Sequence, residues 1–169
     1  MEWYVWLLWI LEIPLVWFLW TVAHEASHVI AANNVTDISN VKWWLYPHRD
    51  EAGKFYFAKV QWNWEAEPTS PINNALIYLA PRFMNILASI ALPFAILLPI
   101  YWMIAWIIFW GAGIVDFIVG SLGMSEYSDL RMAATHLNIN PNIIRGVGFA
   151  VIAISIILCF SLIGFEYAR

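Results

Sequence analysis

Residues 3–32 read WYVWLLWILEIPLVWFLWTVAHEASHVIAA, an apolar run that carries the sequence HEASH near its C-terminal end. With a rise of about 1.5 Å per residue, a helix of about 30 residues is roughly 45 Å long, which exceeds the hydrocarbon core of a bilayer. We therefore predict a transmembrane helix over this run, tilted in the bilayer or protruding from it. This helix decides the fold class of the chain.

The composition of the whole chain is typical of a membrane protein. Of its 169 residues, 62% are apolar and 12% are charged, whereas soluble domains carry roughly 25% charged residues. The net charge of -4 and the absence of any Lys/Arg cluster in the sequence exclude a basic nucleic-acid-binding surface. The single cysteine, Cys159, excludes an internal disulfide. The length predicts one membrane domain, residues 1–169.

Three further apolar runs predict three more spans, at residues 72–92, 98–122 and 142–165. The second and third spans are separated by a bend in the region 93–99, which carries a proline at each end. The polar segment before the last span contains Ser128, which can cap a short helix running to about His136. We expect four transmembrane helices.

A β-hairpin is predicted over residues 41–64. Residues 41–46 and 55–64 are rich in aromatic and β-branched side chains, and they flank turn-forming residues at 47–54. Its tryptophans are typical of a membrane interface. The predicted fold class is an all-α integral membrane protein with four transmembrane helices and a small β-hairpin after the first helix.

The positive charges predict the orientation in the membrane. Arg169 alone lies on the side of the two termini. The opposite side carries the remaining basic residues near the membrane, namely Lys42, Arg49, Lys54, Lys59, Arg131 and Arg145. The positive-inside rule therefore places both termini outside and the hairpin in the cytoplasm, with HEASH near the cytoplasmic face.

The sequence His24-Glu25-Ala26-Ser27-His28 has the pattern H-E-x-x-H. On a helix, the two histidines lie one turn apart on the same face and can bind one Zn²⁺ ion. Glu25 lies about 100° around the helix, where it can act on the attacking water as general base and then acid. An ionised side chain costs roughly 2.5 to 3.5 kcal/mol at the centre of a membrane. Such a cluster therefore indicates compensation, by a metal ion or, as the alternative, by polar partners in a satisfied hydrogen-bond cluster.

A catalytic zinc site needs a third protein ligand, and the sequence offers three candidates. Asp116 lies near the end of the third span, at a depth like that of His28. Asp129 can reach the site only if the polar loop before it folds back beside the first helix. His136 is a weaker candidate, because a lone histidine on a short surface helix is usually solvated.

These motifs resemble the intramembrane zinc metalloproteases of the site-2 protease type, and especially their small, minimal membrane zincin relatives. The resemblance rests on HEASH at 24–28, on APRFMN at 80–85, which is similar to the Gly-Pro-x-x-Asn helix of the family, and on Ser-Asp-Leu at 128–130. It implies that Asp129 is the third zinc ligand and that Asn85 helps to position the substrate. In APRFMN, alanine replaces the glycine, and Asn85 stands one residue further from the proline than in the family. The alternative role for Asn85 is an interhelical hydrogen bond.

The sequence therefore predicts a zinc-dependent intramembrane or membrane-proximal endopeptidase. Its partners would be membrane lipid and a transmembrane or membrane-tethered protein substrate. The alternative is a non-catalytic metal-binding or structural membrane protein. Two other charged residues are expected to be structural: Glu12 forms an interhelical hydrogen bond, and Arg82 extends along the apolar surface to the membrane interface.

The predicted orientation can be tested with the variant Lys54→Cys in a Cys159→Ser background. We expect its thiol to react with a membrane-impermeant reagent only after the cytoplasmic face has been opened. Labelling from outside in intact cells would show that the orientation is the opposite of the predicted one, with the HEASH site at the outer face.

Overall fold

A computed structural model of the chain describes residues 3–50, 53, 55–56, 58–122 and 128–167. Within this described part, four helices are long and apolar enough to cross a membrane: Trp6–Val35, Pro71–Leu97, Ile100–Leu122 and Pro141–Leu158. The predicted number of spans is confirmed, and the chain is a multi-pass membrane protein. Lys54 and residues 125–127, which precede the Ser-Asp-Leu sequence, lie outside the described residues.

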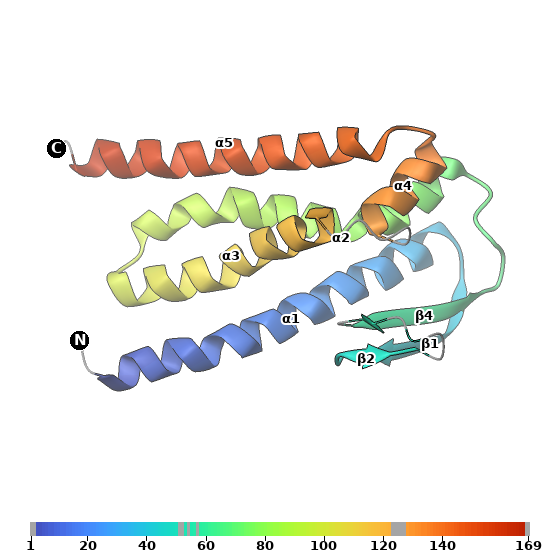
Figure 1. Ribbon diagram of the computed structural model, residues 1–169, viewed down its shortest axis with the longest axis horizontal. Coiled ribbons are helices and arrows are strands. Elements are labelled where there is room, and N and C mark those ends of the chain that lie inside the picture. The colour runs from blue at the N-terminus through green and yellow to red at the C-terminus, as the bar shows by residue number, and fades with distance from the viewer. Residues whose placement is uncertain (1–2, 51–52, 54, 57, 123–127, 168–169) are drawn as a thin grey trace.

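The helices form a bundle whose members run side by side (Figure 1). Both termini lie at one end of the bundle, while the sheet and the short helix α4 lie at the other end. The helices are α1 (Trp3–Val35), α2 (Pro71–Ala91), the 3₁₀ helix η1 (Leu92–Leu97), α3 (Ile100–Leu122), α4 (Asp129–Leu137) and α5 (Pro141–Tyr167).

Local sequence signals explain where these helices begin and end. Pro71 occupies the first turn of α2, where its missing N–H costs nothing, and the side chain of Ser70 caps that turn. The predicted bend is confirmed, because α2 ends just before the proline-containing η1. Ser128 is the N-cap residue of α4 by position, but its side chain makes no capping hydrogen bond, and Asn138 ends this helix in the left-handed conformation with φ of 53°.

The predicted hairpin is confirmed as an antiparallel pair of β1 (Ile38–Trp44) and β4 (Lys59–Trp64). A second, shorter pair follows towards the tip, formed by β2 (His48–Arg49) and β3 (Phe55–Tyr56). The register of β1 shifts between Ser39 and Lys42, where Asn40 has a positive φ of 52°. Such a bulge bends and twists a strand. The sheet lies beside the C-terminal part of α1 (Figure 1).

The core of the bundle joins α1, α2 and α3. Val16 and Trp20 from α1 pack against Ala88 from α2, and the indole Nε1 of Trp20 donates a hydrogen bond of 2.6 Å to the carbonyl oxygen of Phe109 in α3. A Cβ atom on Gly113 of α3 would lie only 2.7 Å from the Cβ of Ala88 and from the ring of Trp20. The close approach of the three helices therefore requires glycine at this position.

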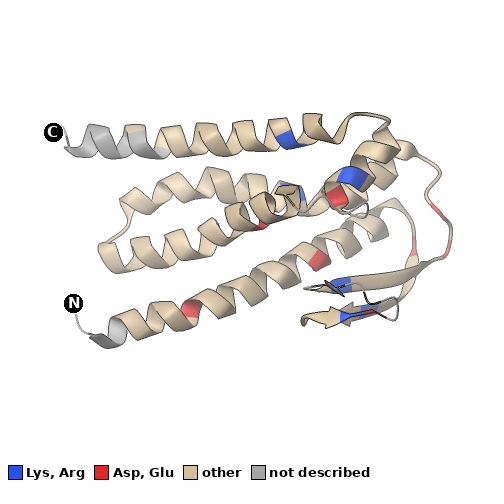
Figure 2. Ribbon diagram, in the orientation of Figure 1, with Lys and Arg blue, Asp and Glu red and all other residues tan. Residues whose placement is uncertain are grey.

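Charged residues are concentrated at the end of the bundle that holds α4 and the sheet (Figure 2). The opposite halves of α2 and α3 show none in this view. This separation is expected when one part of the bundle is surrounded by lipid, where ionised groups are costly.

The packing of Gly113 predicts the effect of a larger side chain there. Gly113→Val should lower the unfolding free energy by about 1–3 kcal/mol, because the added methyl groups overpack the contact with Ala88 and Trp20. Thermal unfolding in detergent measures the change. Gly111→Val is the matched control, because a Cβ at Gly111 meets nothing within 4 Å. Equal effects of the two substitutions would contradict the described packing of α3.

Candidate metal centre

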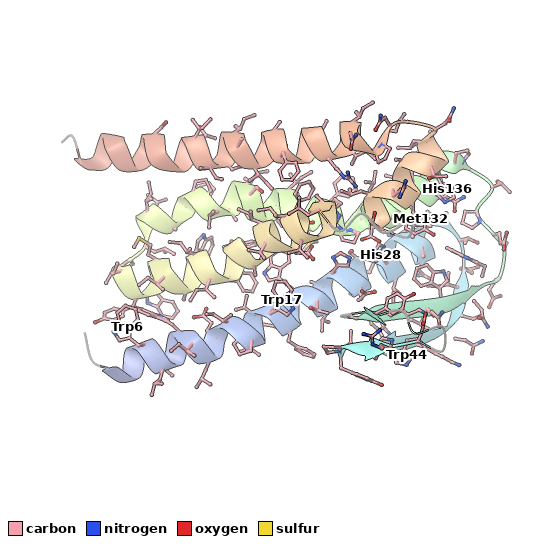
Figure 3. The ribbon with its side chains drawn as sticks, viewed as in Figure 1. Trp6, Trp17, His28, Trp44, Met132 and His136 are labelled. Carbon is pink, nitrogen blue, oxygen red and sulfur yellow. The ribbon has the colours of Figure 1, made fainter. Side chains whose placement is uncertain are left out.

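The two histidines of HEASH lie on the face of α1 that is turned towards α4. Their ring centroids are 5.3 Å apart, as expected for residues one helical turn apart. Figure 3 shows His28 between α1 and the helix that carries Met132 and His136. The side chain of His28 is almost fully buried, and that of His24 is 18% exposed. A metal ion held here would therefore be largely shielded from bulk water.

Asp129 completes a group of three residues that can hold a metal ion. Its Oδ2 lies 3.1 Å from Nε2 of His24, and its Oδ1 lies 3.5 Å from Nε2 of His28. Tetrahedral coordination with bonds of about 2.0–2.2 Å places neighbouring ligand atoms roughly 3.3–3.6 Å apart. The spacings from Asp129 to the two histidines are close to this range, and the three donors are of the kind that binds a small tetrahedral cation such as Zn²⁺.

The helix α4 carries Asp129 to this position. On its inner face, Leu130, Ala133 and Ala134 are buried, and α4 packs mainly against α2. The helix α4 thus lies against α2, and the side chain of its first residue, Asp129, reaches His24 and His28 of α1.

The carboxyl group of Asp129 is held in its ionised form. Burial acts to raise its pKa, but hydrogen bonds and charge interactions with His24 and His28 outweigh this effect, so the pKa lies well below its usual range. A carboxylate is the form of aspartate that binds a metal ion.

The second ring nitrogen of each histidine is also occupied. Nδ1 of His28 donates a hydrogen bond of 2.7 Å to the carbonyl oxygen of Ile77 in α2. Nδ1 of His24 lies 3.2 Å from Oδ2 of Asp116 in α3. Both imidazoles are thereby oriented so that Nε2 faces Asp129.

These contacts distinguish the three candidates for the third ligand. Asp129 lies on the Nε2 side of both histidines, whereas Asp116 contacts the opposite nitrogen of His24 and does not belong to the metal-holding group. His136 does not belong to it either. Its ring stacks on Tyr78 with centroids 5.6 Å apart, and Tyr78 in turn lies edge-on to His28.

The expectation that Arg82 extends to the membrane interface is wrong. Its side chain is 8% exposed and is directed into the bundle, where Nη2 donates a hydrogen bond of 3.1 Å to Oδ2 of Asp129. Nη1 lies 3.5 Å from Oδ2 of Asp116. In an apolar bundle, two nearby carboxylates hold a guanidinium more strongly than the distant interface does. Arg82 is thus the residue of this site that sequence reasoning missed.

Asn85 lies in the same network and is buried. Its Nδ2 donates hydrogen bonds of 2.7 Å to the carbonyl oxygen of Gly113 and 3.0 Å to Oδ2 of Asp116. Its Oδ1 accepts a hydrogen bond from Arg82. Both N–H groups of the amide are therefore already used, and a substrate could receive one only if a bond to α3 broke. These contacts favour the interhelical role of Asn85 over substrate positioning.

Glu25 lies at the side of the site that faces the sheet. Its carboxylate interacts with the charges of His24, His28 and Asp129, and with the backbone N–H of Val60 in β4. Among the described residues, β4 pairs with β1 alone, so the other edge of β4 has no partner strand. Glu25 is thus placed between the histidines and a strand of the hairpin.

Comparisons with protein-family models, with curated proteins and with solved structures found no match to this chain.

The geometry predicts which substitutions abolish metal binding. His28→Ala and Asp129→Ala should each lose the bound ion, because each removes one of three ligands, whereas Asp116→Ala should still bind one ion per chain at saturating metal. Metal analysis of the purified, detergent-solubilised variants measures this. His136→Ala is the matched control for His28→Ala and should keep the ion. A metal-replete Asp129→Ala protein would contradict the ligand set, most directly if Asp116→Ala were metal-free.

Proposed function

We propose that this protein is a zinc-dependent endopeptidase that cleaves transmembrane or membrane-tethered proteins, as its resemblance to the site-2 protease type implies. One observation carries the proposal: His24, His28 and Asp129 converge at spacings that suit Zn²⁺, with Glu25 beside them. Two histidines and a carboxylate leave the fourth tetrahedral position open, which distinguishes catalytic from structural zinc sites.

The charges of the site support a divalent cation. Three carboxylates, those of Glu25, Asp116 and Asp129, lie close to His24, and among the described residues Arg82 is the arginine or lysine that pairs with two of them, Asp116 and Asp129. With neutral histidines, the formal charges leave an excess of two negative charges in an apolar bundle. An ion such as Zn²⁺ neutralises this excess, and neutrality lowers the cost of burying the cluster.

The residues then have separate tasks in peptide hydrolysis. When bound, zinc supplies a Lewis acid that polarises the substrate carbonyl and lowers the pKa of water. Glu25 takes a proton from the attacking water and later delivers it to the nitrogen of the leaving amine. The C–N bond breaks as that nitrogen accepts the proton. The Nδ1 atoms of His24 and His28 are engaged with Asp116 and with the carbonyl oxygen of Ile77, which leaves Nε2 of each ring to bind the metal.

The unpaired edge of β4 offers a route for substrate binding. A peptide in a helix hides its carbonyl groups in intrahelical hydrogen bonds, so a protease must first bind it in an extended form. An exposed strand edge binds extended peptides by main-chain hydrogen bonds. The interaction of Val60 with Glu25 places that edge beside the general base. We infer that the substrate pairs with β4 as an additional strand.

The competing function is that of a non-catalytic protein that binds a metal for structure or sensing. Such a site needs only its three ligands, and Glu25, which lies outside the metal-holding group, would then serve only to hold the hairpin through the N–H of Val60. The role of Glu25 therefore separates the two functions.

The decisive variant is Glu25→Gln. It should keep one zinc ion per chain and the thermal stability of the wild type, yet cleave a membrane-tethered substrate about 10²–10⁴-fold more slowly, because an amide cannot take the proton from water. Cleavage in proteoliposomes and metal analysis of the same preparation measure both properties. Gln61→Glu is a control for charge near the hairpin, since Gln61 is exposed and pairs with Lys42 across the sheet.

Turnover that is unchanged in Glu25→Gln would remove the role of Glu25 as general base, whereas wild-type protein that binds zinc but cleaves no membrane-tethered substrate would leave the non-catalytic metal-binding protein. The same assay tests the strand edge with two tethered substrates of equal composition, one extended and one helical around the cleavage site. The extended substrate should be cleaved at least about tenfold faster if β4 recruits it by pairing. Equal rates would contradict recruitment by the strand edge.

A further inference from the structure

The metal-holding group rests on a second set of polar residues in which Asp116 is central. His24 directs Nε2 towards Asp129 and Nδ1 towards Asp116, at 3.1 and 3.2 Å. The two carboxylates therefore lie at opposite nitrogens of one imidazole. Asp129 belongs to the metal-holding group, and Asp116 lies on the opposite side of the His24 ring from the metal position.

Asp116 is itself held in place by two other side chains. Its Oδ2 accepts a hydrogen bond of 3.0 Å from Asn85, and Nη1 of Arg82 lies 3.5 Å from the same atom. Arg82 also donates to Asn85 and to Asp129. The guanidinium thus connects the carboxylate behind His24 with the carboxylate that faces the metal position.

The sequence of α3 allows Asp116 to come this close to α1. Gly113 and Gly120 lie three residues before and four residues after Asp116, so all three share one face of the helix. A Cβ on Gly113 would meet Ala88 and Trp20, and a Cβ on Gly120 would lie 2.7 Å from Nη2 of Arg82. The glycines create the space in which Asp116 and Arg82 meet.

We propose that Asp116 is a positioning residue of the metal centre: it accepts the Nδ1–H of His24 and so fixes the imidazole tautomer and orientation that present Nε2 to the metal. The proposal rests on the proposed zinc site and assigns to Asp116 a task other than direct ligation. Carboxylates that accept the second N–H of a ligating histidine also make the imidazole a stronger base, and their loss commonly weakens metal binding 10–100-fold.

A role in helix packing alone does not explain the carboxylate. An asparagine at position 116 could accept hydrogen bonds from His24 and Asn85 without placing an additional negative charge among apolar helices. The charge is useful where a neighbouring imidazole must bind a cation. Arg82 and the bound metal offset its cost.

The test is the zinc affinity of Asp116→Asn, measured by competition with a chelator in detergent. We expect an affinity about 10–100-fold below that of the wild type, with one zinc ion per chain still bound at saturation. Substitution with Co²⁺ provides a second readout. Its visible absorption should keep the intensity of a four-coordinate site, because no ligand has been removed.

Two further variants complete the test. Glu12→Gln is the matched control, because it makes the same change from carboxylate to amide in a helix about 18 Å from His24 by helical rise, and its zinc affinity should equal that of the wild type. Asn85→Ala removes a hydrogen-bond donor that holds Asp116. It should weaken zinc binding several-fold while one zinc ion per chain is still bound at saturation. If Asp116→Asn does not fold, the zinc affinity of Asn85→Ala tests the proposal in its place.

Three outcomes would overturn the proposal. An Asp116→Asn protein with lower thermal stability but wild-type zinc affinity would leave Asp116 a packing role only. Loss of the bound ion at saturation, as expected for Asp129→Ala, would make Asp116 a ligand. Wild-type protein that binds no zinc would overturn the zinc site as well, whereas the first two outcomes leave the proposed peptidase intact.

Discussion

Burial of charge in an apolar bundle is the constraint on which this structure depends. Asp129 is the residue at which the constraint is met, because its carboxylate contacts His24 and His28 of α1 and Arg82 of α2. Each of these groups would be costly alone, since an unpaired ion in lipid or protein interior is destabilised by several kcal/mol. Together these contacts hold α1, α2 and α4 close to one another at the carboxylate of Asp129. The position of α4, which carries Asp129, follows from these contacts and from its apolar contact with α2.

The features that the sequence predicts well are those with a local pattern. The apolar runs, the proline-containing bend and the turn between two aromatic segments give the four spans and the hairpin, with boundaries that differ from the observed ones by only a few residues. The sequence HEASH likewise predicts the convergence of His24 and His28, because residues four apart always share a face of an α-helix. None of these inferences requires knowledge of how the helices pack.

The features that escaped prediction depend on how separate helices are rotated and offset. Asp116 and Asp129 are 92 and 105 residues from His24 in the chain, and the sequence alone does not show which nitrogen of His24 each of them approaches. Only the packed bundle shows that one approaches Nδ1 and the other Nε2. Arg82 was misjudged for the same reason: its length allowed it to reach the interface, but two carboxylates from other helices lie closer. The glycines at 113 and 120 were the available signal, because their spacing around Asp116 marks the face of α3 that approaches other helices.

The proposed chemistry unites these elements. The helices hold the histidines and carboxylates at fixed separations, which avoids reorganisation during the reaction. The hairpin brings a strand edge to Glu25 at the end of the bundle where charged groups gather, and the proposed function requires water and an extended substrate to enter from that end. Rigid support of the ligands and access from one side are both needed for hydrolysis within a membrane protein.

The central claim is that His24, His28 and Asp129 hold a zinc ion, and X-ray absorption at the zinc edge of the purified wild-type protein tests it most directly. The account predicts a first shell of about four nitrogen and oxygen atoms at about 2.0–2.1 Å, with the outer-shell scattering of two imidazoles. Protein without bound zinc, or a zinc shell without imidazole, would contradict it.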